Sequence, residues 1–590
     1  MKTRFGFLVA AAVFIALPLY AQDFDSTEED QPPKADIFDE SDRDLYADPA
    51  PTEAEKEAAP SPPSEEAPLF DEPNATTEDT VKAAGEQEEK DKKFRFSDFI
   101  DTKINIAYAD DNLLENNEFS PAMGIGQRNV SEFVGNAGEV RPVDINHTHL
   151  VLHHKSDGYL PGVLTEAALV IRFKLATDAM SGQPQPSVGD DGTFLRAGYI
   201  FDHKTAKKTL IDLTGFPFDA ERFLLGYHYD LTWGGMASFP QNRDPVPGLR
   251  IGFEHPRFYV FAGFKTHLQP KKDKLNTERV PVETVYAGLF GAGVTIIKGL
   301  MLEANGGVIQ KGDNPNMPEV EDNAKRDDIL AWGVSSRLSY ARGLKIGDRM
   351  DLRLYQNDPR HQLEFARPDE YEAGKFSFMV SAEGDFLQEN LQDPDSTGGT
   401  KPFQAPAALI AAKFKYDYAR FHVEGSYRSL EFLLFDTPGF VPFQALPKTA
   451  RTRPELAGVV AVDYHIKPAY LTLGLALGYK RPATYQGAIG VPIAVVKRRT
   501  ASTAYISPFN RPIEILPADK DAFDIIETKF DLAFHLSDFM TFLFEMSYTL
   551  DNNRVKLVTS EENSEELRKD FEDSSIRNRL GLAAVVQAKF

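Results

Sequence analysis

The chain has 590 residues, no cysteine and a net charge of −24, and 42% of its residues are apolar. Such an acidic balance argues against nucleic acid as a partner, because nucleic-acid binders present basic surfaces to phosphates. Beyond the N-terminus, no apolar run reaches the roughly 18 residues that a membrane-spanning helix needs. A helical membrane protein is therefore excluded.

The first 21 residues, MKTRFGFLVAAAVFIALPLYA, have the pattern of a secretory signal peptide. Lys2 and Arg4 precede an apolar run, and small residues lead to a cleavage position after Ala21. We therefore expect the chain to leave the cytoplasm. The lack of cysteine is compatible with an oxidising compartment that is entered without structural disulfides.

Residues 22–92 have a different composition, with 24 Asp and Glu against 6 Lys and Arg and with many prolines. Large apolar side chains are too few here for burial to offset the entropy lost on ordering. The sequence predicts a disordered acidic segment, followed by one folded domain over residues 93–590.

From Phe94 onward, apolar and polar residues alternate with period two in runs of about 10 residues, which is typical of strands. In Tyr470–Lys480, for example, every second residue is Leu or Tyr, and the residues between them are mostly small. Strands are expected near 98–109, 143–154, 164–175, 193–203, 207–214, 221–231, 248–254, 257–267, 282–297, 300–310, 328–341, 349–356, 374–388, 406–418, 420–431, 456–466, 469–480, 522–535, 539–550 and 577–590.

The last strand, RNRLGLAAVVQAKF, alternates to the end of the chain, and its apolar row includes Leu582, Ala584, Val586 and Phe590. This stretch resembles the C-terminal strand of Gram-negative outer-membrane porins, in which such a row with a final Phe is the signal that the barrel-assembly machinery reads. Ala588 departs from the pattern, because an aromatic residue is common there. The stretch FLLGYHYDLTWGG, at 223–235, is similar to porins of deltaproteobacteria.

The resemblance implies an all-β fold, a transmembrane antiparallel up-and-down β-barrel of about 18 strands (16–20). Short turns such as Lys298–Gly299 and Lys467–Pro468 alternate with long polar connections such as 481–521 and 551–576. A soluble sandwich also alternates, but a barrel in lipid turns its apolar residues outward and its polar residues inward. A barrel of this size encloses a water-filled lumen.

Charged residues recur on the face predicted to point inward. An Arg or Lys facing lipid at mid-depth costs about 2–4 kcal/mol, so we expect these side chains to line the pore and to pair across the lumen. The loop Thr232–Pro247 is a candidate constriction. The pore-lining candidates are Arg172, Arg196, Arg337, Arg353, Arg420, Arg428, Asp230, Glu303, Glu383, Asp385, Glu424, Glu527, Asp531 and Glu545.

No enzyme signature is found: the chain has no GxSxG, HExxH or phosphate-binding loop. Alternate histidines at His147, His149, His153 and His154 could bind a divalent cation, but a polar strand near a barrel rim is the preferred interpretation. We therefore expect no catalytic residue, no metal and no cofactor.

The sequence thus favours an outer-membrane porin that passes small hydrophilic solutes or ions by passive diffusion, with residues 22–92 in the periplasm. Outer-membrane lipid, lipopolysaccharide and the assembly machinery are the partners that the resemblance implies. A monomer and a homotrimer both remain open. The alternatives are a structural barrel that tethers a periplasmic partner through its acidic tail, and a barrel enzyme.

Overall fold

The computed structural model describes residues 103–110, 113–114, 122–125, 148–177, 184–190, 193–201, 209–218, 225–228, 231–233, 247–270, 282–313, 328–344, 372–396, 399–435, 445–496, 513–537, 539–559, 567–571 and 578–589. The predicted signal peptide, the predicted acidic segment 22–92 and the terminal Phe590 lie outside these residues. None of the helices in the described part is long and apolar enough to cross a membrane.

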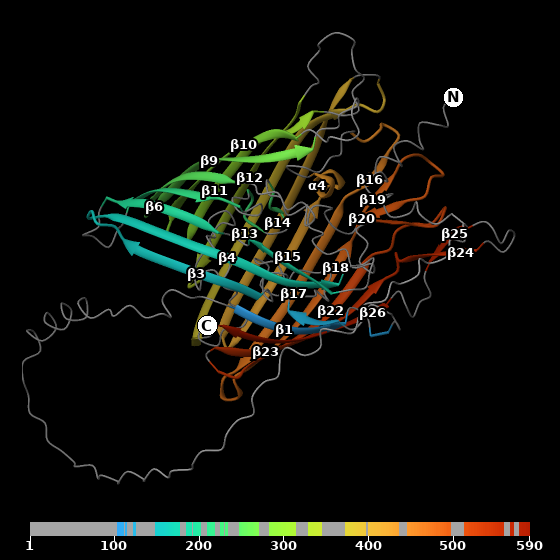
Figure 1. Cartoon of the computed structure of the whole chain (residues 1–590). Coiled ribbons are helices and arrows are strands. Elements are labelled where there is room, and N and C mark those ends of the chain that lie inside the picture. Colours follow the sequence, from blue (N-terminus) through green and yellow to red (C-terminus); the bar gives the residue numbers. More distant parts are fainter. Residues whose placement is uncertain are drawn as a thin grey trace, which may run out of the picture. The chain divides into compact units, whose positions relative to one another are not determined.

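Most of the described chain forms one 20-stranded antiparallel sheet (Figure 1). Its strands are β1 (Lys103–Asp110), β2 (Ala122–Ile125), β3 (Thr148–Asp157), β4 (Val163–Thr177), β5 (Pro184–Asp190), β6 (Phe194–Ile200), β7 (Leu210–Phe216), β8 (Gly248–His255), β9 (Phe258–Pro270), β10 (Val282–Ile297), β11 (Leu300–Asp313), β12 (Asp328–Arg342), β13 (Glu372–Gln392), β14 (Thr400–Asp417), β15 (Ala419–Arg428), β17 (Glu455–Ile466), β18 (Leu471–Arg481), β22 (Ile525–His535), β23 (Met540–Asp551) and β26 (Asn578–Lys589).

Strands that follow one another along the chain pair with one another from β6 to β15, which is an up-and-down order. The order continues through β17, β18, β22, β23 and β26. The first strand, β1, pairs with the last, β26, from Lys103↔Lys589 to Asp110↔Leu582. On its other edge β1 pairs with β2, and with β3 at Lys103↔His149. The predicted all-β, antiparallel, up-and-down fold is therefore confirmed.

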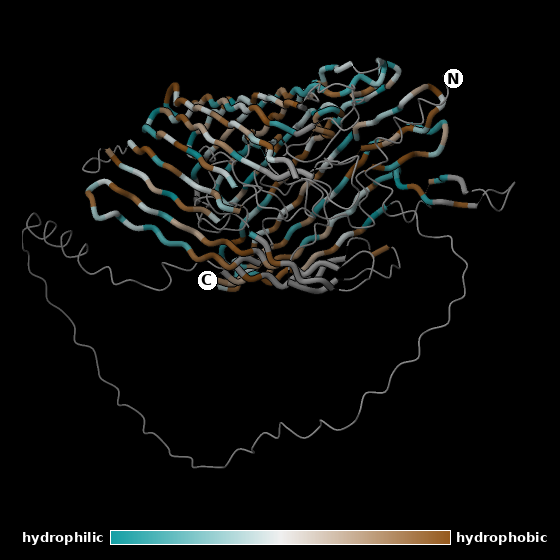
Figure 2. Tube along the Cα trace, turned by 45° about the horizontal axis from the view of Figure 1, so that its top comes forward, coloured by the Kyte–Doolittle hydropathy of each residue, from teal (hydrophilic) through white to brown (hydrophobic). Residues whose placement is uncertain are grey.

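The two faces of the sheet have opposite character, and Figure 2 shows the alternation along the strands. On β18 the leucines and Tyr479 lie on the exposed face, whereas Thr472 and Lys480 are buried on the other. On β13, Phe376 and Val380 are exposed, whereas Glu383 is buried. The exposed face is thus apolar and the buried face carries the charges, which reverses the arrangement of a soluble sandwich.

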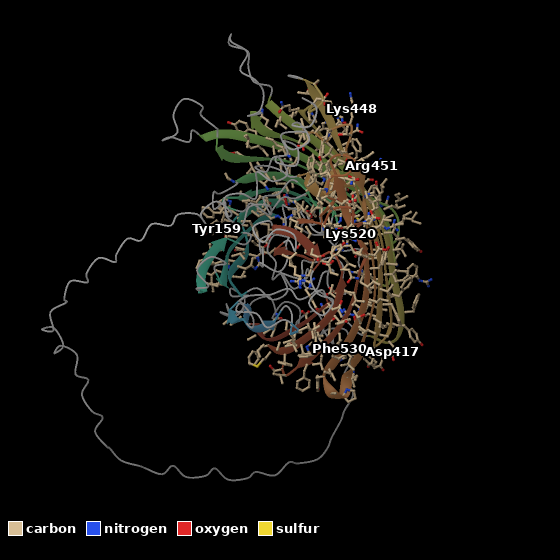
Figure 3. The ribbon with its side chains drawn as sticks, turned by 90° about the vertical axis from the view of Figure 1, so that its right-hand side faces the viewer. Tyr159, Asp417, Lys448, Arg451, Lys520 and Phe530 are labelled. Atoms are coloured by element: carbon tan, nitrogen blue, oxygen red, sulfur yellow. The ribbon has the colours of Figure 1, made fainter. Side chains whose placement is uncertain are left out.

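Short turns join the strands at one end of the sheet. Asp417, with φ of 53°, forms the tight turn between β14 and β15, and the 3₁₀ turn η6 (Lys467–Ala469) joins β17 to β18. Most long connections leave the other end, where Lys448 lies, as Figure 3 shows for Lys448 and Asp417. The predicted alternation of short and long connections agrees with this arrangement except between β12 and β13, whose long connection starts and ends beside the short turns.

The long connections themselves contain secondary structure, which the sequence analysis did not predict. They hold the helix α4 (Leu430–Leu434) and the strands β16 (Arg451–Arg453), β19 (Ala483–Gln486), β20 (Ala494–Val496), β21 (Ile513–Ile515), β24 (Val555–Thr559) and β25 (Leu567–Phe571). β16, β19, β20 and β21 form a second sheet, whose Tyr485 and Val496 pack against Leu433 of α4. β16 and β19 continue the pairing register of β17 and β18 beyond Pro454 and Pro482. This second sheet and α4 are here called the outer module. Burial raises the pKa of Tyr485 in the outer module.

One of the predicted strands differs from the structure, and another is not tested by it. The prediction for 221–231 is wrong, because the described residues there contribute only a single bridge, Leu225↔Trp233. Its alternating apolar residues pack against the buried face of the large sheet rather than joining it. The predicted strand 349–356 lies outside the described residues.

The turn between β10 and β11 offers a test of the backbone geometry. Gly299 has φ of 85°, and an added Cβ would lie 2.2 Å from the carbonyl oxygen of Ala341. We expect Gly299→Ala to lower the free energy of unfolding by about 1–3 kcal/mol. Urea unfolding in detergent micelles measures this change. Gly288→Ala on β10, where a Cβ meets nothing within 4 Å, is the matched control and should be close to neutral; equal stability of the two variants would contradict this geometry.

Candidate functional site

Charged side chains on the buried face form ion pairs, mostly between neighbouring strands. On one side of the sheet, Arg196 of β6 lies between Glu166 of β4 and Asp212 of β7. Arg250 of β8 reaches the same Asp212, at 3.2 Å. Four strands are thus joined by one alternating row of charges. The expected pairing across a lumen is not seen in this row, because its pairs join adjacent or next-adjacent strands, the latter where Arg196 lies 3.8 Å from Glu254 of β8.

The same pairing recurs farther along the sheet. Arg337 of β12 donates from Nε to Glu303 of β11 at 2.8 Å, and Arg420 of β15 donates to Asp463 of β17 at 2.9 Å. Arg428 pairs with Glu455 on the same two strands as Arg420 and Asp463. Lys529 of β22 lies 3.1 Å from both Asp531 and Glu545, so two carboxylates surround one cation there.

The residues 225–228 and 231–233, here called the inward segment, lie between β7 and β8 in the chain and pack against the buried face. Leu225, His228, Leu231 and Trp233 are all buried. Gly226 has φ of 89°, and a Cβ there would lie 2.8 Å from the carbonyl oxygen of Leu231. The tight return of the segment therefore requires glycine at this position.

Polar contacts fix the inward segment to β11, β12 and β13. The carboxylate of Glu383 accepts the backbone N–H groups of Tyr227 and His228, each at 2.7 Å. The side-chain oxygen of Asn305 accepts the N–H of Gly226 at 3.1 Å. The indole N–H of Trp233 donates to the hydroxyl of Ser335 at 2.8 Å. The backbone N–H groups of the segment are thus bonded to side chains of β11 and β13 instead of to a neighbouring strand.

His228 of the inward segment also contacts β15. Nε2 of His228 lies 3.1 Å from Oε2 of Glu424, and Nε2 of His422 lies 3.2 Å from the same oxygen. The guanidinium of Arg337 lies over the ring of Tyr227, 4.8 Å from its centroid. The inward segment therefore leaves the sheet after β7 and reaches as far as β15, and its contacts with Glu383 and Glu424 join strands that are not neighbours of β7.

Small residues on the wall make room for the segment. A Cβ at Gly307 of β11 would lie 2.9 Å from Leu225, and one at Gly333 of β12 would lie 2.9 Å from the indole of Trp233. Leu225 and Trp233 pack in an apolar cluster with side chains of β9–β14. This cluster covers part of the face that the sequence analysis expected to be polar.

The outer end of the cluster is closed by the connection after β15. Ser429 caps α4 by accepting the N–H of Phe432, which is buried in the apolar cluster. Phe435 lies beside Lys311, whose Nζ is 4.7 Å from the ring centroid and 2.6 Å from a carboxylate oxygen of Glu389. Burial raises the pKa of Glu431 in this helix.

Most of the sequence-predicted pore-lining residues lie on the buried face, in the contacts given above. Asp385 is buried beside Glu383 on β13, and Glu527 accepts the hydroxyl of Thr549 at 2.8 Å. Arg172 belongs to β4, opposite His149 on β3. Asp230 and Arg353 lie outside the described residues. Leu582, Ala584 and Val586 share the apolar face of β26, as predicted.

The sequence analysis missed several residues of the site. Asn305, Ser335, Gly307 and Gly333 were not singled out, because a lone Asn, Ser or Gly on a strand has no pattern of its own. The inward position of Tyr227, His228 and Trp233 was masked by their apolar alternation. Their one usable signal is the glycine at 226, which weakens a strand interior.

The predicted interpretation of the histidine cluster as a polar strand agrees with the described part. His153 lies 3.0 Å from Glu166, and His154 is exposed on the other face of β3. His147 lies outside the described residues. Within the part of the chain that the structure describes, no group of three or more His, Asp or Glu residues is placed to hold a metal ion.

No protein-family model and no curated protein matches the chain. Among solved structures, it is similar to the outer membrane protein OprD of Pseudomonas aeruginosa, with 9% identity over 85% of this chain and 96% of that chain and a TM-score of 0.36. It is also similar to OccAB2 of Acinetobacter baumannii (10% identity, 83% and 97%, TM-score 0.38) and to OmpT of Vibrio cholerae (10%, 83% and 98%, 0.31). The predicted likeness to outer-membrane porins is confirmed as a likeness. At these identities and TM-scores, the role of a residue in those proteins is not carried over to any residue of this chain.

The anchoring of the inward segment by Glu383 can be tested with fluorescence. The chain has two tryptophans, so Trp332→Phe leaves Trp233 as the only reporter. In that background, Glu383→Ala removes the acceptor of two buried N–H groups, a loss of about 1–3 kcal/mol each. We expect a red-shifted emission and stronger quenching by acrylamide.

The matched control is Glu527→Ala in the same background, because Glu527 lies on β22 and bonds to Thr549. Its emission should stay blue-shifted and protected. An emission unchanged by Glu383→Ala would show that Glu383 does not hold the segment.

Proposed function

We propose that the large sheet closes into an 18-stranded transmembrane barrel that acts as an outer-membrane channel. β2 pairs only with β1, and β5 only with β4. Of the other 18 strands, 17 pair in order from β3 to β26, and β1 pairs with β26 from Lys103↔Lys589 to Asp110↔Leu582 and with β3 at Lys103↔His149. In the proposed barrel, β1 closes the row between β26 and β3, because a bilayer-spanning sheet needs both of its edges paired.

The single observation that carries the proposal is the reversed polarity of the two faces. Large apolar side chains such as Leu338, Ile410 and Leu475 are 48%, 63% and 51% exposed. In contrast, Arg337 on the strand of Leu338 and Lys480 on the strand of Leu475 are buried. Water would make such an exposed face costly, but hydrocarbon makes it favourable. Tyr340, Tyr416 and Tyr479, near strand ends, supply the aromatic belts of the two interfaces.

In this proposal the inward segment narrows the lumen, and small hydrophilic solutes or ions pass by diffusion beside it. The buried faces of β17, β18 and β26 carry small residues, among them Ala461, Ala476 and Ala583. The paired charges give the passage a polar surface with little net field. We therefore expect weak ion selectivity.

The remaining expectations stay proposals. The barrel lies in the bacterial outer membrane, in contact with lipid and lipopolysaccharide, after insertion by the assembly machinery that reads the β26 pattern. The acidic segment 22–92 extends into the periplasm. A tethering role for this segment and an enzyme role for the barrel are the alternatives, and no described residue favours either of them.

Single-channel recording in a planar bilayer tests the proposal directly. Refolded full-length protein that migrates as a heat-modifiable band should give stable steps of nanosiemens scale. The Glu383→Ala variant should give larger steps, because the inward segment is released. No conductance from protein shown to be folded would overturn the channel assignment.

The role of paired charges can be tested by removing one cation. Lys529→Gln leaves Asp531 and Glu545 without the ammonium between them. The reversal potential in a salt gradient should then shift toward cation preference, because two carboxylates on the lumen wall lose their counter-charge. Leu475→Gln on the exposed face is the control and should leave the reversal potential unchanged. A shift toward anions would contradict the proposed lumen position of Lys529.

A further inference from the structure

Among the described residues of the inward segment, His228 is the residue whose charge changes near neutral pH. An imidazole exchanges its proton between about pH 5 and pH 8, whereas the phenol of Tyr227 and the indole of Trp233 keep their charge in this range. The side chain of His228 is buried. It therefore adds a pH-dependent contact to the backbone contacts that the segment makes with Glu383.

The contact of His228 with Glu424 depends on charge. Nε2 of His422 forms a hydrogen bond with Oε2 of Glu424 at 3.2 Å. Nε2 of His228 lies 3.1 Å from the same oxygen, which is the distance of an ion pair, but the two groups are not aligned as a hydrogen bond requires. An imidazolium is attracted to a carboxylate in this position far more strongly than a neutral imidazole is. The contact with β15 is therefore strong while His228 carries its second proton and weakens when that proton leaves.

The charged side chains around His228 favour its protonated form. Titratable and charged groups lie on the buried face of the five strands around it: Glu303 of β11, Arg337 of β12, Glu383 and Asp385 of β13, Lys413 of β14, and His422 and Glu424 of β15. Arg337 is bound to Glu303, and Lys413 lies opposite His422 in the register of β14 and β15. The carboxylates of β13 and β15 exceed the remaining cation, so a proton on His228 lowers the electrostatic energy of the group.

His228 lies at the turn of the inward segment. Leu225 and Trp233 exchange two backbone hydrogen bonds, each of 2.9 Å, which hold the two ends of the segment together. Between them, the carbonyl oxygen of His228 accepts the N–H of Leu231 at 3.0 Å. A contact made by the side chain of His228 therefore fixes the turn to β15, whereas the ends of the segment are fixed by their own pairing and by the apolar cluster.

We propose that His228 is a proton-sensitive attachment of the inward segment, through which pH sets the width of the passage. With His228 protonated, the turn is bound to Glu424 and the segment narrows the lumen. Loss of the proton weakens this contact and loosens the turn. The narrowing is therefore strongest in acid and weakest in alkali. The inference rests on the proposed channel function and on the position of the segment in the lumen.

The emission of Trp233 as a function of pH tests the attachment in the full-length Trp332→Phe protein. From about pH 5 to about pH 9 the emission should shift to the red and quenching by acrylamide should increase. His228→Gln keeps the backbone N–H and removes the charge, so its emission should stay red-shifted throughout this range. His153→Gln, whose parent side chain lies 3.0 Å from Glu166, is the matched control and should keep the shift with pH.

Three other results would contradict the proposal. A shift with pH that persists in His228→Gln would overturn the role of His228. Loss of the shift in His422→Gln alone would assign the titration to His422. An emission that shifts to the red as the pH falls would assign it to Glu383, because protonation of this carboxylate weakens the acceptor of two backbone N–H groups.

Conductance of the same proteins, each with heat-modifiable migration, separates this inference from the channel assignment. Wild-type steps should grow from about pH 5 to about pH 9, and the steps of His228→Gln should be large at both. Fluorescence reports the segment whether or not the sheet conducts. A pH-dependent emission from folded protein without conductance therefore contradicts only the channel. Stable steps from protein whose emission does not change with pH contradict only the role of His228.

Discussion

In the proposed transmembrane placement, the constraint on which the rest of the structure depends is that hydrocarbon offers neither hydrogen bonds nor a place for charge. Every spanning strand then needs a neighbouring strand on both sides. The first and last strands are not neighbours in the sequence, and the pairing of β1 with β26 joins them. The same constraint turns the charged side chains of the strands to the buried face. The reversed polarity of the sheet is thus what the proposed placement in a bilayer requires.

Charged side chains that lie on one face of the sheet then need partners of opposite charge. Several Arg side chains on that face are close to carboxylates, as in Arg420 with Asp463 and Arg337 with Glu303. The desolvation of such pairs offsets much of their attraction, so they add little net stability, but leaving one partner alone would cost several kcal/mol. A slip of one residue would turn every charge toward lipid, which makes these pairs strong determinants of register.

The sequence predicted the features that depend on the period-two alternation of apolar residues and on the positions of charged residues. The alternation in Tyr470–Lys480 predicted both faces of β18, and the charges on 376–386 predicted which side of β13 is buried. It could not predict the inward segment, because Leu225, Tyr227 and Trp233 alternate as a strand does, and only partners distant in sequence decide their place. Glu383, Asn305 and Ser335 lie about 80 to 160 residues away from the groups that they bind. No local pattern reports a contact over that separation.

Pro454 and Pro482 mark the junction between the large sheet and the outer module. Each lies where the β17–β18 hairpin leaves the wall, and β16 and β19 resume the same register beyond them. Proline donates no hydrogen to the ladder, so the two halves of the hairpin are weakly coupled at this level. At this level the module is joined to the large sheet chiefly through α4, whose Phe432 packs in the apolar cluster of the sheet and whose Leu433 packs on the module. A peptide grafted between β19 and β20 would be displayed on a rigid stalk without disturbing the strands below.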